Sequence, residues 1–258
     1  MTTPSDADRQ VRERPAPASP ARTAVDSAAF LLPYLRPGMS LLDVGCGPGS
    51  ITAGLAHVVA PGEVTGVDLR MPKQVSGFRF VQADACRLPF PDSGFDAGFD
   101  AVFMHGVLQH LPDPLVALRE ARRVARPGAV IGVRDCDWDG QLIHPTSPML
   151  ARSFALLDRM REGTSPRVGK QLRELLTRAG FSPVLATASI LDTADDPAAT
   201  GRFTGRFFTT PAVRESALRE GWATERELDQ MRDAWLAWGE DPGAYWVRIW
   251  CEVVAYAD

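Results

Sequence analysis

The chain has 258 residues, a hydrophobic content of 45% and a formal net charge of -4, with a pI near 5.6. These values fit one soluble enzyme domain with a full buried core, and they exclude a general electrostatic attraction to nucleic acid. No apolar run reaches the ~18 residues of a membrane span, and the four cysteines have no spacing typical of zinc ligands. We therefore expect a cytoplasmic protein with reduced thiols, no metal site, and no nucleic-acid or membrane partner.

The predicted elements begin after residue 21. Residues 1–21 are rich in Pro, Ala and Arg without apolar periodicity, so they are expected to form a mobile or disordered arm. An apolar helical stripe from Ala28 to Leu35 then ends at Pro37 and Gly38. Strands and helices follow in alternation, with strands at 40–44, 63–68, 79–83, 99–105, 129–134, 183–190 and 245–256, and helices at 50–59, 114–125, 147–162 and 170–179. This order predicts an α/β fold with a doubly wound, mostly parallel sheet of seven strands.

A long helical insertion is predicted at about 197–239, before the last strand. It carries six large aromatic residues, namely Phe203, Phe207, Phe208, Trp222, Trp235 and Trp238. Aromatic residues at helical spacing are more often core than substrate wall. The place of the insertion in the chain nevertheless favours a lid, and we expect residues 22–258 to form one domain that carries it.

The most informative stretch is the glycine-rich turn at 45–49, which joins a short apolar strand to a helix. Glycine has no Cβ, so such a turn lets a ligand lie against bare backbone. Dinucleotide folds use G-x-G-x-x-G, whereas the third glycine here comes one residue earlier. Pro48 also lacks the N–H that would face a pyrophosphate. The turn therefore favours an adenosyl ligand, and an NAD-dependent oxidoreductase is the weaker alternative.

Further stretches follow the glycine turn in a fixed order: VTGVDL at 64–69, FVQADA at 80–85 with LPFP at 88–91, FDAVFMHGVLQHLPDP at 99–114 and RPGAVIGVRD at 126–135. Together they resemble the class I S-adenosylmethionine-dependent methyltransferases, in the small-molecule branch of ubiquinone and menaquinone methyltransferase-like enzymes. The resemblance covers residues 22–136, about half of the chain. It implies a Rossmann-like sheet, S-adenosylmethionine as cofactor and S-adenosylhomocysteine as its product.

Two segments depart from the family pattern. Residues 69–79 are too few for the usual helix after the second strand and include Pro72 and Gly77, so a turn at most is expected there. A tandem Phe-Asp-Ala repeat at 94–101 stands where the family has one copy, and we expect it to lengthen the loop before the fourth strand.

The resemblance implies a set of cofactor-binding residues at the strand ends, namely Asp43, Gly45, Cys46, Gly47, Gly49, Asp68, Leu69, Asp84, Ala85 and His105. Asp68 is placed to accept both ribose hydroxyls, because a carboxylate has two oxygens for two donors. Asp84 and the amide of Ala85 would bind the adenine. Arg22 and Thr23 precede the first helix and are further candidates to close over the cofactor.

Methyl transfer from a sulfonium is an in-line displacement with an activated donor, so it needs no covalent nucleophile. A base is needed only when the acceptor holds its proton tightly. The candidates are His110 and His105, after the fourth strand, and Asp135 and Asp137, after the fifth. His110 follows Gln109, where family members often have glutamate, and its alternative role is to hold its loop as a buried histidine.

The expected acceptor is a small apolar or aromatic molecule of specialised metabolism. Its candidate pocket residues are Trp138, Arg167, Phe203 and Phe207. A protein that uses the adenosyl ligand for a cyclisation or as a structural ligand remains an alternative. The chain is expected to be a monomer or a homodimer.

Overall fold

The computed structural model describes residues 22–72, 76–94, 97–192 and 196–258. These residues divide into two compact units. The sheet unit comprises the described parts of 22–137, 164–189 and 250–258, and the helical unit those of 138–163 and 190–249. None of the helices in these stretches is long and apolar enough to cross a bilayer. The arm predicted at 1–21 lies outside the described residues.

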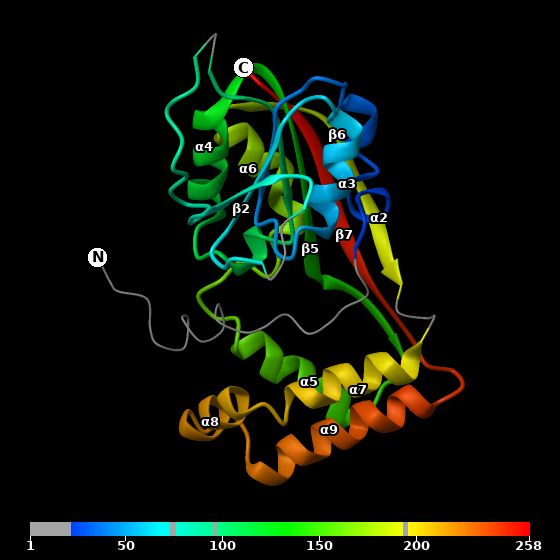
Figure 1. Cartoon of the computed structure of the whole chain (residues 1–258). Helices are drawn as coiled ribbons and strands as arrows, with labels where there is room; N and C mark the ends of the chain where they lie inside the picture. Colours follow the sequence, from blue (N-terminus) through cyan, green and yellow to red (C-terminus); the bar gives the residue numbers. More distant parts are fainter. Residues whose placement is uncertain (1–21, 73–75, 95–96, 193–195) are drawn as a thin grey trace. The chain divides into compact units, whose positions relative to one another are not determined.

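A sheet of seven strands occupies the described chain, in the order β3-β2-β1-β4-β5-β7-β6 (Figure 1). The strands are β1 Leu41–Val44, β2 Val64–Asp68, β3 Arg79–Gln82, β4 Phe99–His105, β5 Ala125–His144, β6 Phe181–Asp192 and β7 Tyr245–Ala257. Neighbours from β3 to β5 in this order are parallel. The predicted doubly wound α/β sheet is thus confirmed.

The fifth strand is much longer than the predicted 129–134. Because β5 continues to His144, the residues Asp135, Asp137 and Trp138 lie within the strand, and the prediction that they follow it is wrong. A Cβ at Gly140 would lie 3.0 Å from Ile249 of β7, so the two strands approach closely at this point. Pairing with β7, which lies more than a hundred residues further along the chain, extends β5 beyond the apolar run from which its end was predicted.

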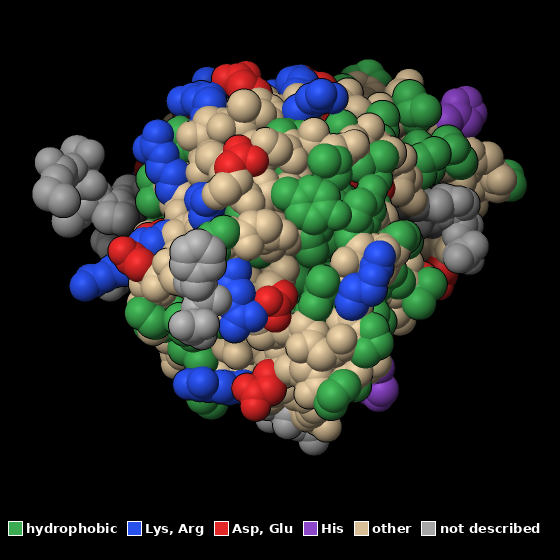
Figure 2. All heavy atoms as spheres, turned by 90° about the horizontal axis from the view of Figure 1, so that it is seen from above, with side chains coloured by type: hydrophobic (Ala, Val, Ile, Leu, Met, Phe, Trp, Pro, Cys, Tyr) green, Lys and Arg blue, Asp and Glu red, His purple; other side chains and the backbone are tan. Residues whose placement is uncertain are grey.

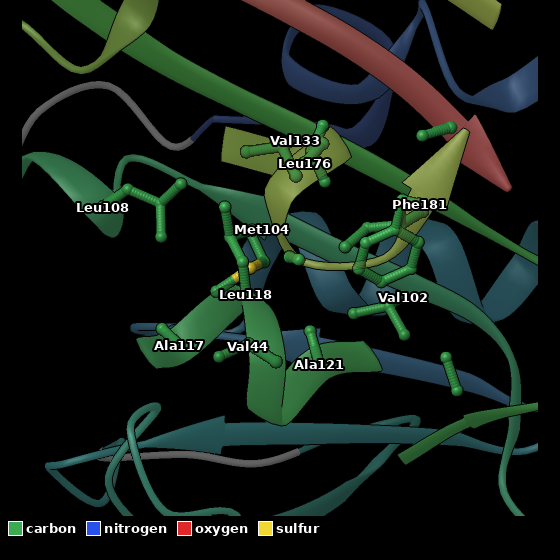
Figure 3. Packing of buried hydrophobic residues seen from close by; sticks show 14 of the residues in the cluster. Val44, Val102, Met104, Leu108, Ala117, Leu118, Ala121, Val133, Leu176 and Phe181 are labelled. Carbon is green, nitrogen blue, oxygen red and sulfur yellow. The ribbon is translucent and has the colours of Figure 1, made fainter. Parts of the chain in front are cut away.

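Helices cover both faces of the sheet unit. One face carries α2 Ala24–Ala28, the 3-10 turn η1 Leu32–Tyr34 and α3 Ser50–Val59, and the other carries α4 Pro114–Val124 and α6 Leu172–Arg178, which the turn η3 Gly169–Gln171 precedes. Successive side chains of a strand point to opposite faces. Accordingly, Val102 and Met104 pack toward α4 and α6 (Figure 3), whereas Ala101 and Phe103 pack toward α2 and α3.

The first helix begins and ends earlier than the predicted stripe over 28–35. Thr23 caps α2 by accepting a hydrogen bond from the Asp26 amide at 3.2 Å. Pro33 lacks an N–H and disfavours helix at the preceding residue, so the chain continues as a 3-10 turn. Between β2 and β3, the described residues 69–72 and 76–78 contain no helix, as predicted. In the repeat segment, Gly94 pairs with Ala97 and residues 99–101 belong to β4, while residues 95–96 lie outside the described part.

The helical unit contains α5 Pro148–Arg159, α7 Pro197–Phe207, α8 Pro211–Arg219 and α9 Glu225–Glu240, with α7 beside α9 (Figure 1). The predicted insertion at 197–239 is therefore helical, and the unit also includes α5. Trp235 is fully buried in its core against Trp238, Trp246 and Phe208, and donates from its indole nitrogen to Ser153 Oγ at 2.9 Å. Most of the aromatic residues thus build a core of their own.

Candidate functional site

The strand order reverses between β1 and β4, and these two strands are neighbours in the sheet. Val44 at the end of β1 is paired with Met104, one residue before the end of β4. The glycine turn follows β1, and residues 106–110, ending in the turn η2 Leu108–His110, follow β4. In open α/β sheets, ligands bind outside the carboxyl ends of the strands at such a reversal. The candidate site is therefore built from these two loops and the end of β2.

The glycine turn is fixed to β2 and leaves room for a ligand. The amides of Gly45 and Cys46 both donate to the carbonyl of Val67, at 2.7 and 3.0 Å. Gly45 has a φ of 77°, and a Cβ there would lie 2.2 Å from Val107 Cγ2. At Gly47, by contrast, a Cβ would meet no atom within 4 Å. The turn is thus tightly packed at its start and open at its middle.

Asp43, within β1, is buried and bonded to the helix that follows the glycine turn. Its side chain is 2% exposed and accepts a hydrogen bond from Thr52 Oγ1, on α3, at 2.6 Å. Burial raises the pKa of Asp43 to about 7, with a further contribution from the nearby carboxylate of Asp68. Cys46 is also buried, and burial raises the pKa of its thiol, which keeps it protonated and unreactive.

Asp68, the last residue of β2, faces the glycine turn. Its Oδ2 accepts from the Gly47 amide at 2.9 Å, and its Oδ1 accepts from the Arg70 amide at 3.1 Å. The two backbone donors fix the orientation of the carboxylate. Because each carboxylate oxygen can accept more than one hydrogen bond, capacity remains for two further hydroxyl donors.

The segment after β3 lies beside the end of β2. The Ala83 amide donates to the Asp68 carbonyl at 3.0 Å, and Gln82 Nε2 donates to the carbonyl of the exposed Leu69 at 3.0 Å. Asp84 is exposed and closes a tight turn by accepting from the Cys86 amide at 2.8 Å. The structure therefore brings together the predicted residues at 43–49, 68–69 and 84–85.

Asp135 holds the loop after β4. This fully buried side chain accepts from the amides of Leu108 and Gln109 at 2.7 and 3.3 Å through Oδ2, and from the Cys136 amide at 2.9 Å through Oδ1. Burial raises the pKa of Asp135 to about 7 in spite of these donors. His110 ends the same loop and is exposed, so it is not the buried histidine considered as its alternative role.

Asp135→Asn is expected to flatten the dependence of stability on pH. The pKa of this carboxyl is about 7 in the folded protein against an ordinary 3.8, so between these values only the folded state keeps the proton. The free energy of unfolding must then fall as the pH rises through this window, by ~3 kcal/mol over about two pH units. Urea unfolding at about pH 5 and pH 8 should show this loss in the unmodified chain and a smaller one in the variant.

Gln109→Ala is the matched control for that measurement. It disturbs the same loop, because Gln109 Oε1 lies 2.9 Å from Cys136 Sγ, but it keeps the Asp135 carboxyl. It should lower stability without changing the slope against pH. Equal slopes for Asp135→Asn and the unmodified chain would contradict the role assigned to this carboxyl.

His105, the last residue of β4, lies in a buried polar cluster that the sequence did not reveal. Its Nε2 is 3.0 Å from Arg22 Nη1, and its ring stacks on Trp250 with 4.8 Å between centroids. The Arg134 guanidinium also lies over the Trp250 ring, 4.7 Å from its centroid, and it pairs with the Glu252 carboxylate at 2.9 Å. In the sequence, the β7 residues of this cluster look like part of one apolar strand, so only His105 and Arg22 could be singled out.

The remaining predicted residues are divided between the two units. In the sheet unit, Asp137 is buried and accepts from the Lys170 amide at 3.1 Å, and Arg167 is half-buried. In the helical unit, the Arg161 guanidinium stacks on Trp138 at 3.7 Å. Phe203 is 43% exposed there, and Phe207 is half-buried beside Phe208.

Charge is mixed on one face of the molecule. Figure 2 shows one face on which acidic and basic side chains are interspersed among apolar ones. In the part of the chain that the structure describes, no three His, Cys, Asp or Glu side chains form a group that could hold a metal.

Comparison with known proteins finds methyltransferases among the similar sequences and structures. Residues 42–133 match a family model described as a methyltransferase domain. An uncharacterized methyltransferase of Schizosaccharomyces pombe is 30% identical over 244 residues, which cover 85% of each chain. Demethylmenaquinone methyltransferase of Staphylococcus aureus is 36% identical over 135 residues, which cover 47% of this chain and 51% of that protein. A candidate methyltransferase of Bacillus halodurans, known from its crystal structure, is similar in fold, with a TM-score of 0.56, 16% identity and coverage of 88% of this chain and 97% of that one.

Proposed function

The chain belongs to the class I S-adenosylmethionine-dependent methyltransferase family, and we propose that it methylates a small apolar or aromatic organic molecule of specialised metabolism. The observation that carries this proposal is the arrangement at the glycine turn. There, the open space beside Gly47 adjoins a carboxylate, that of Asp68, which two backbone amides hold in place.

The residues present fit the cofactor. The glycine turn offers bare backbone with room beside it, Asp68 keeps acceptor capacity for the ribose hydroxyls, and Asp84 and Ala85 lie at the next strand end for the adenine. When bound, the cofactor supplies a methyl group on a positively charged sulfur. Asp43, buried and bonded to Thr52, connects β1 to the helix that follows the turn.

Catalysis would depend chiefly on positioning. Alignment of two reactants can supply ~7 to 11 kcal/mol of the barrier, and the rigid loops after β1 and β4 are suited to that task. His110 is the better of the two histidines for a base, because it is exposed at the end of the loop that Asp135 fixes. His105 is buried, and its pKa is lowered to about 2 by burial and by the guanidinium groups of Arg22 and Arg134, so it is a poor base.

His110→Ala is expected to reduce methyl transfer at least 10-fold while it leaves the affinity for S-adenosylhomocysteine unchanged. General bases contribute about 10²- to 10⁴-fold, and an exposed loop residue is not needed to hold the cofactor. Single-turnover transfer of a labelled methyl group to a panel of phenols, naphthols and 1,3-diketones measures the effect. Added imidazole should restore part of the rate. An unchanged rate, or a loss that imidazole does not relieve, would contradict the role of base.

Acceptor recognition is proposed for Trp138, Arg167, Phe203 and Phe207. Support comes from accessibility: Phe203 is exposed and Trp138 and Phe207 are half-buried, whereas the tryptophans of α9 are buried in the core of the helical unit. The acidic net charge is consistent with a small-molecule acceptor and does not favour a polynucleotide.

Calorimetric titration tests the cofactor site directly. S-adenosylhomocysteine should bind saturably, and NADH should not bind. Preference for NADH would overturn the proposal. A chain that binds S-adenosylhomocysteine but transfers no methyl label to any acceptor in the panel would instead support the alternative of a cyclising or structural use of the cofactor.

A further inference from the structure

His110 is exposed, but the backbone around it is held by hydrogen bonds. Its own amide donates to the Val107 carbonyl at 3.0 Å, within the turn η2. Just before it, the amides of Leu108 and Gln109 donate to the buried Asp135 carboxylate. Exposed loops are usually among the more mobile parts of a protein. The turn that carries His110 is therefore more firmly fixed than its exposure suggests.

The carbonyls on either side of His110 are bound by one distant residue, Ser165. The Ser165 amide donates to the Gln109 carbonyl at 3.2 Å, and the Ser165 hydroxyl donates to the Leu111 carbonyl at 2.9 Å. Gln109 and Leu111 are the immediate neighbours of His110 in the chain, whereas Ser165 comes 54 residues after Leu111. The two bonds therefore fix the path of the backbone through His110.

Ser165 is itself attached to the core of the sheet unit. Pro166 follows it and disfavours a helical conformation at Ser165. The Ser165 carbonyl accepts from the amide of Val168, whose side chain is 1% exposed in the core. A Cβ at Gly169 would lie 3.0 Å from the Cys136 backbone, so this segment lies directly against β5. All five residues belong to the sheet unit, and Ser165 can serve there as a fixed support.

A general base needs such a support more than most exposed residues do. Its ring nitrogen must lie within hydrogen-bond reach of the proton that it removes, and a misplacement of about 1 Å can cost about 100-fold in rate. The position of an imidazole is set by its backbone and two side-chain torsions. Asp135 binds the amides before His110, and Ser165 binds the carbonyls on both sides of it.

We propose that Ser165 is a positioning residue for His110 in methyl transfer. It holds the backbone on both sides of the histidine, so that the imidazole stays in place for proton removal from the acceptor. This inference rests on the proposed function, because His110 is a base only in that reaction. The hydrogen bonds of Ser165 do not depend on it.

Hydrogen exchange on the full chain tests whether Ser165 holds the turn. Ser165→Ala removes the hydroxyl donor and keeps the amide. The net loss of one neutral hydrogen bond corresponds to about fivefold in an equilibrium constant, so the amides of residues 108–111 should exchange about fivefold faster. Ser165→Thr keeps a hydroxyl and should restore slow exchange. Unchanged exchange in Ser165→Ala would overturn the proposal.

A double-variant cycle tests whether Ser165 acts through His110. Single-turnover transfer to an active member of the panel of phenols, naphthols and 1,3-diketones should be at least about threefold slower in Ser165→Ala. The affinity for S-adenosylhomocysteine should not change. In the His110→Ala background the same substitution should cost nothing further, because the group that it positions is gone.

Ser182→Ala is the matched control for the rate measurement. Ser182 Oγ donates to Asp258 Oδ1 at 2.6 Å in an exposed pair on β6, so this variant also loses one hydroxyl hydrogen bond in the sheet unit. It should transfer methyl groups at the rate of the unmodified chain. A threefold loss in Ser182→Ala as well would show that the rate reports general destabilisation, and it would overturn the positioning role.

The possible results separate this inference from the proposed function. Equal losses from Ser165→Ala with and without His110, or a loss of affinity for S-adenosylhomocysteine, would overturn the positioning role and leave His110 as the base. An unchanged rate in His110→Ala, or no transfer to any member of the panel, would overturn the base and the positioning role together. Calorimetry with S-adenosylhomocysteine reports on the cofactor site in every case.

Discussion

Asp68→Asn is expected to weaken the binding of S-adenosylhomocysteine at least about 100-fold. The carboxylate faces the glycine turn through the Gly47 amide and has capacity for two ribose hydroxyls. A hydrogen bond to a charged group is worth about 1.5–3 kcal/mol, so two weakened bonds amount to ~3 kcal/mol, which is about 100-fold in affinity. Titration calorimetry measures the loss.

Asp92→Asn is the control for the change of charge. Asp92 pairs with Arg123 on the surface, where its side chain is 83% exposed. This variant should bind S-adenosylhomocysteine as the unmodified chain does. If Asp68→Asn lost less than about threefold in affinity, the ribose contact at the end of β2 would be wrong, and the adenosyl group would have to bind elsewhere.

Arg134→Met should lower the free energy of unfolding by about 3–5 kcal/mol, because it leaves the buried Glu252 carboxylate without its partner. The two side chains are 3% and 10% exposed and 2.9 Å apart. Replacing both members by apolar residues removes the unpaired charge, so Arg134→Met with Glu252→Met should recover most of the loss. Urea unfolding of both variants, followed by fluorescence and circular dichroism, gives the comparison.

The exposed pair of Arg178 and Glu174 on α6 provides the matched control. Its members are 56% and 70% exposed, so Arg178→Met should change stability by less than about 1 kcal/mol. Should the double variant at 134 and 252 be no more stable than Arg134→Met alone, the cost would lie in lost packing against Trp250 and not in a buried charge.

Local signals predicted the first four strands of the fold. The strands that end at Val44, Asp68 and His105 are short apolar runs with turn residues after them, and their bounds agree with the prediction within about two residues. The positions of Gly47 and Asp68 follow from the same pattern, because backbone bonds fix the glycine turn to β2 and the Gly47 amide donates to the Asp68 carboxylate at the end of that strand. Here sequence neighbours are also structural neighbours.

The polar cluster at the end of β4 could not be predicted in this way. Arg134, Ser189 and Glu252 come from three strands that meet only in the sheet, and Trp250 resembles any core residue in its apolar strand. The full length of β5 could not be predicted for the same reason, because it depends on pairing with a strand that is distant in the sequence. Composition could not show which aromatic residues of the insertion are buried and which are exposed. Packing within the helical unit decides this.

Gly45 and Val107 lie next to each other, so the loops after β1 and β4 are packed together. Since a Cβ at 45 would overlap the Val107 side chain, with Cγ2 only 2.2 Å away, neither loop can be redesigned alone. A smaller side chain at 107 would make room for a side chain at 45, although the positive φ of Gly45 would still strain any residue other than glycine there. Substitutions in the glycine turn should therefore be paired with a smaller residue at position 107.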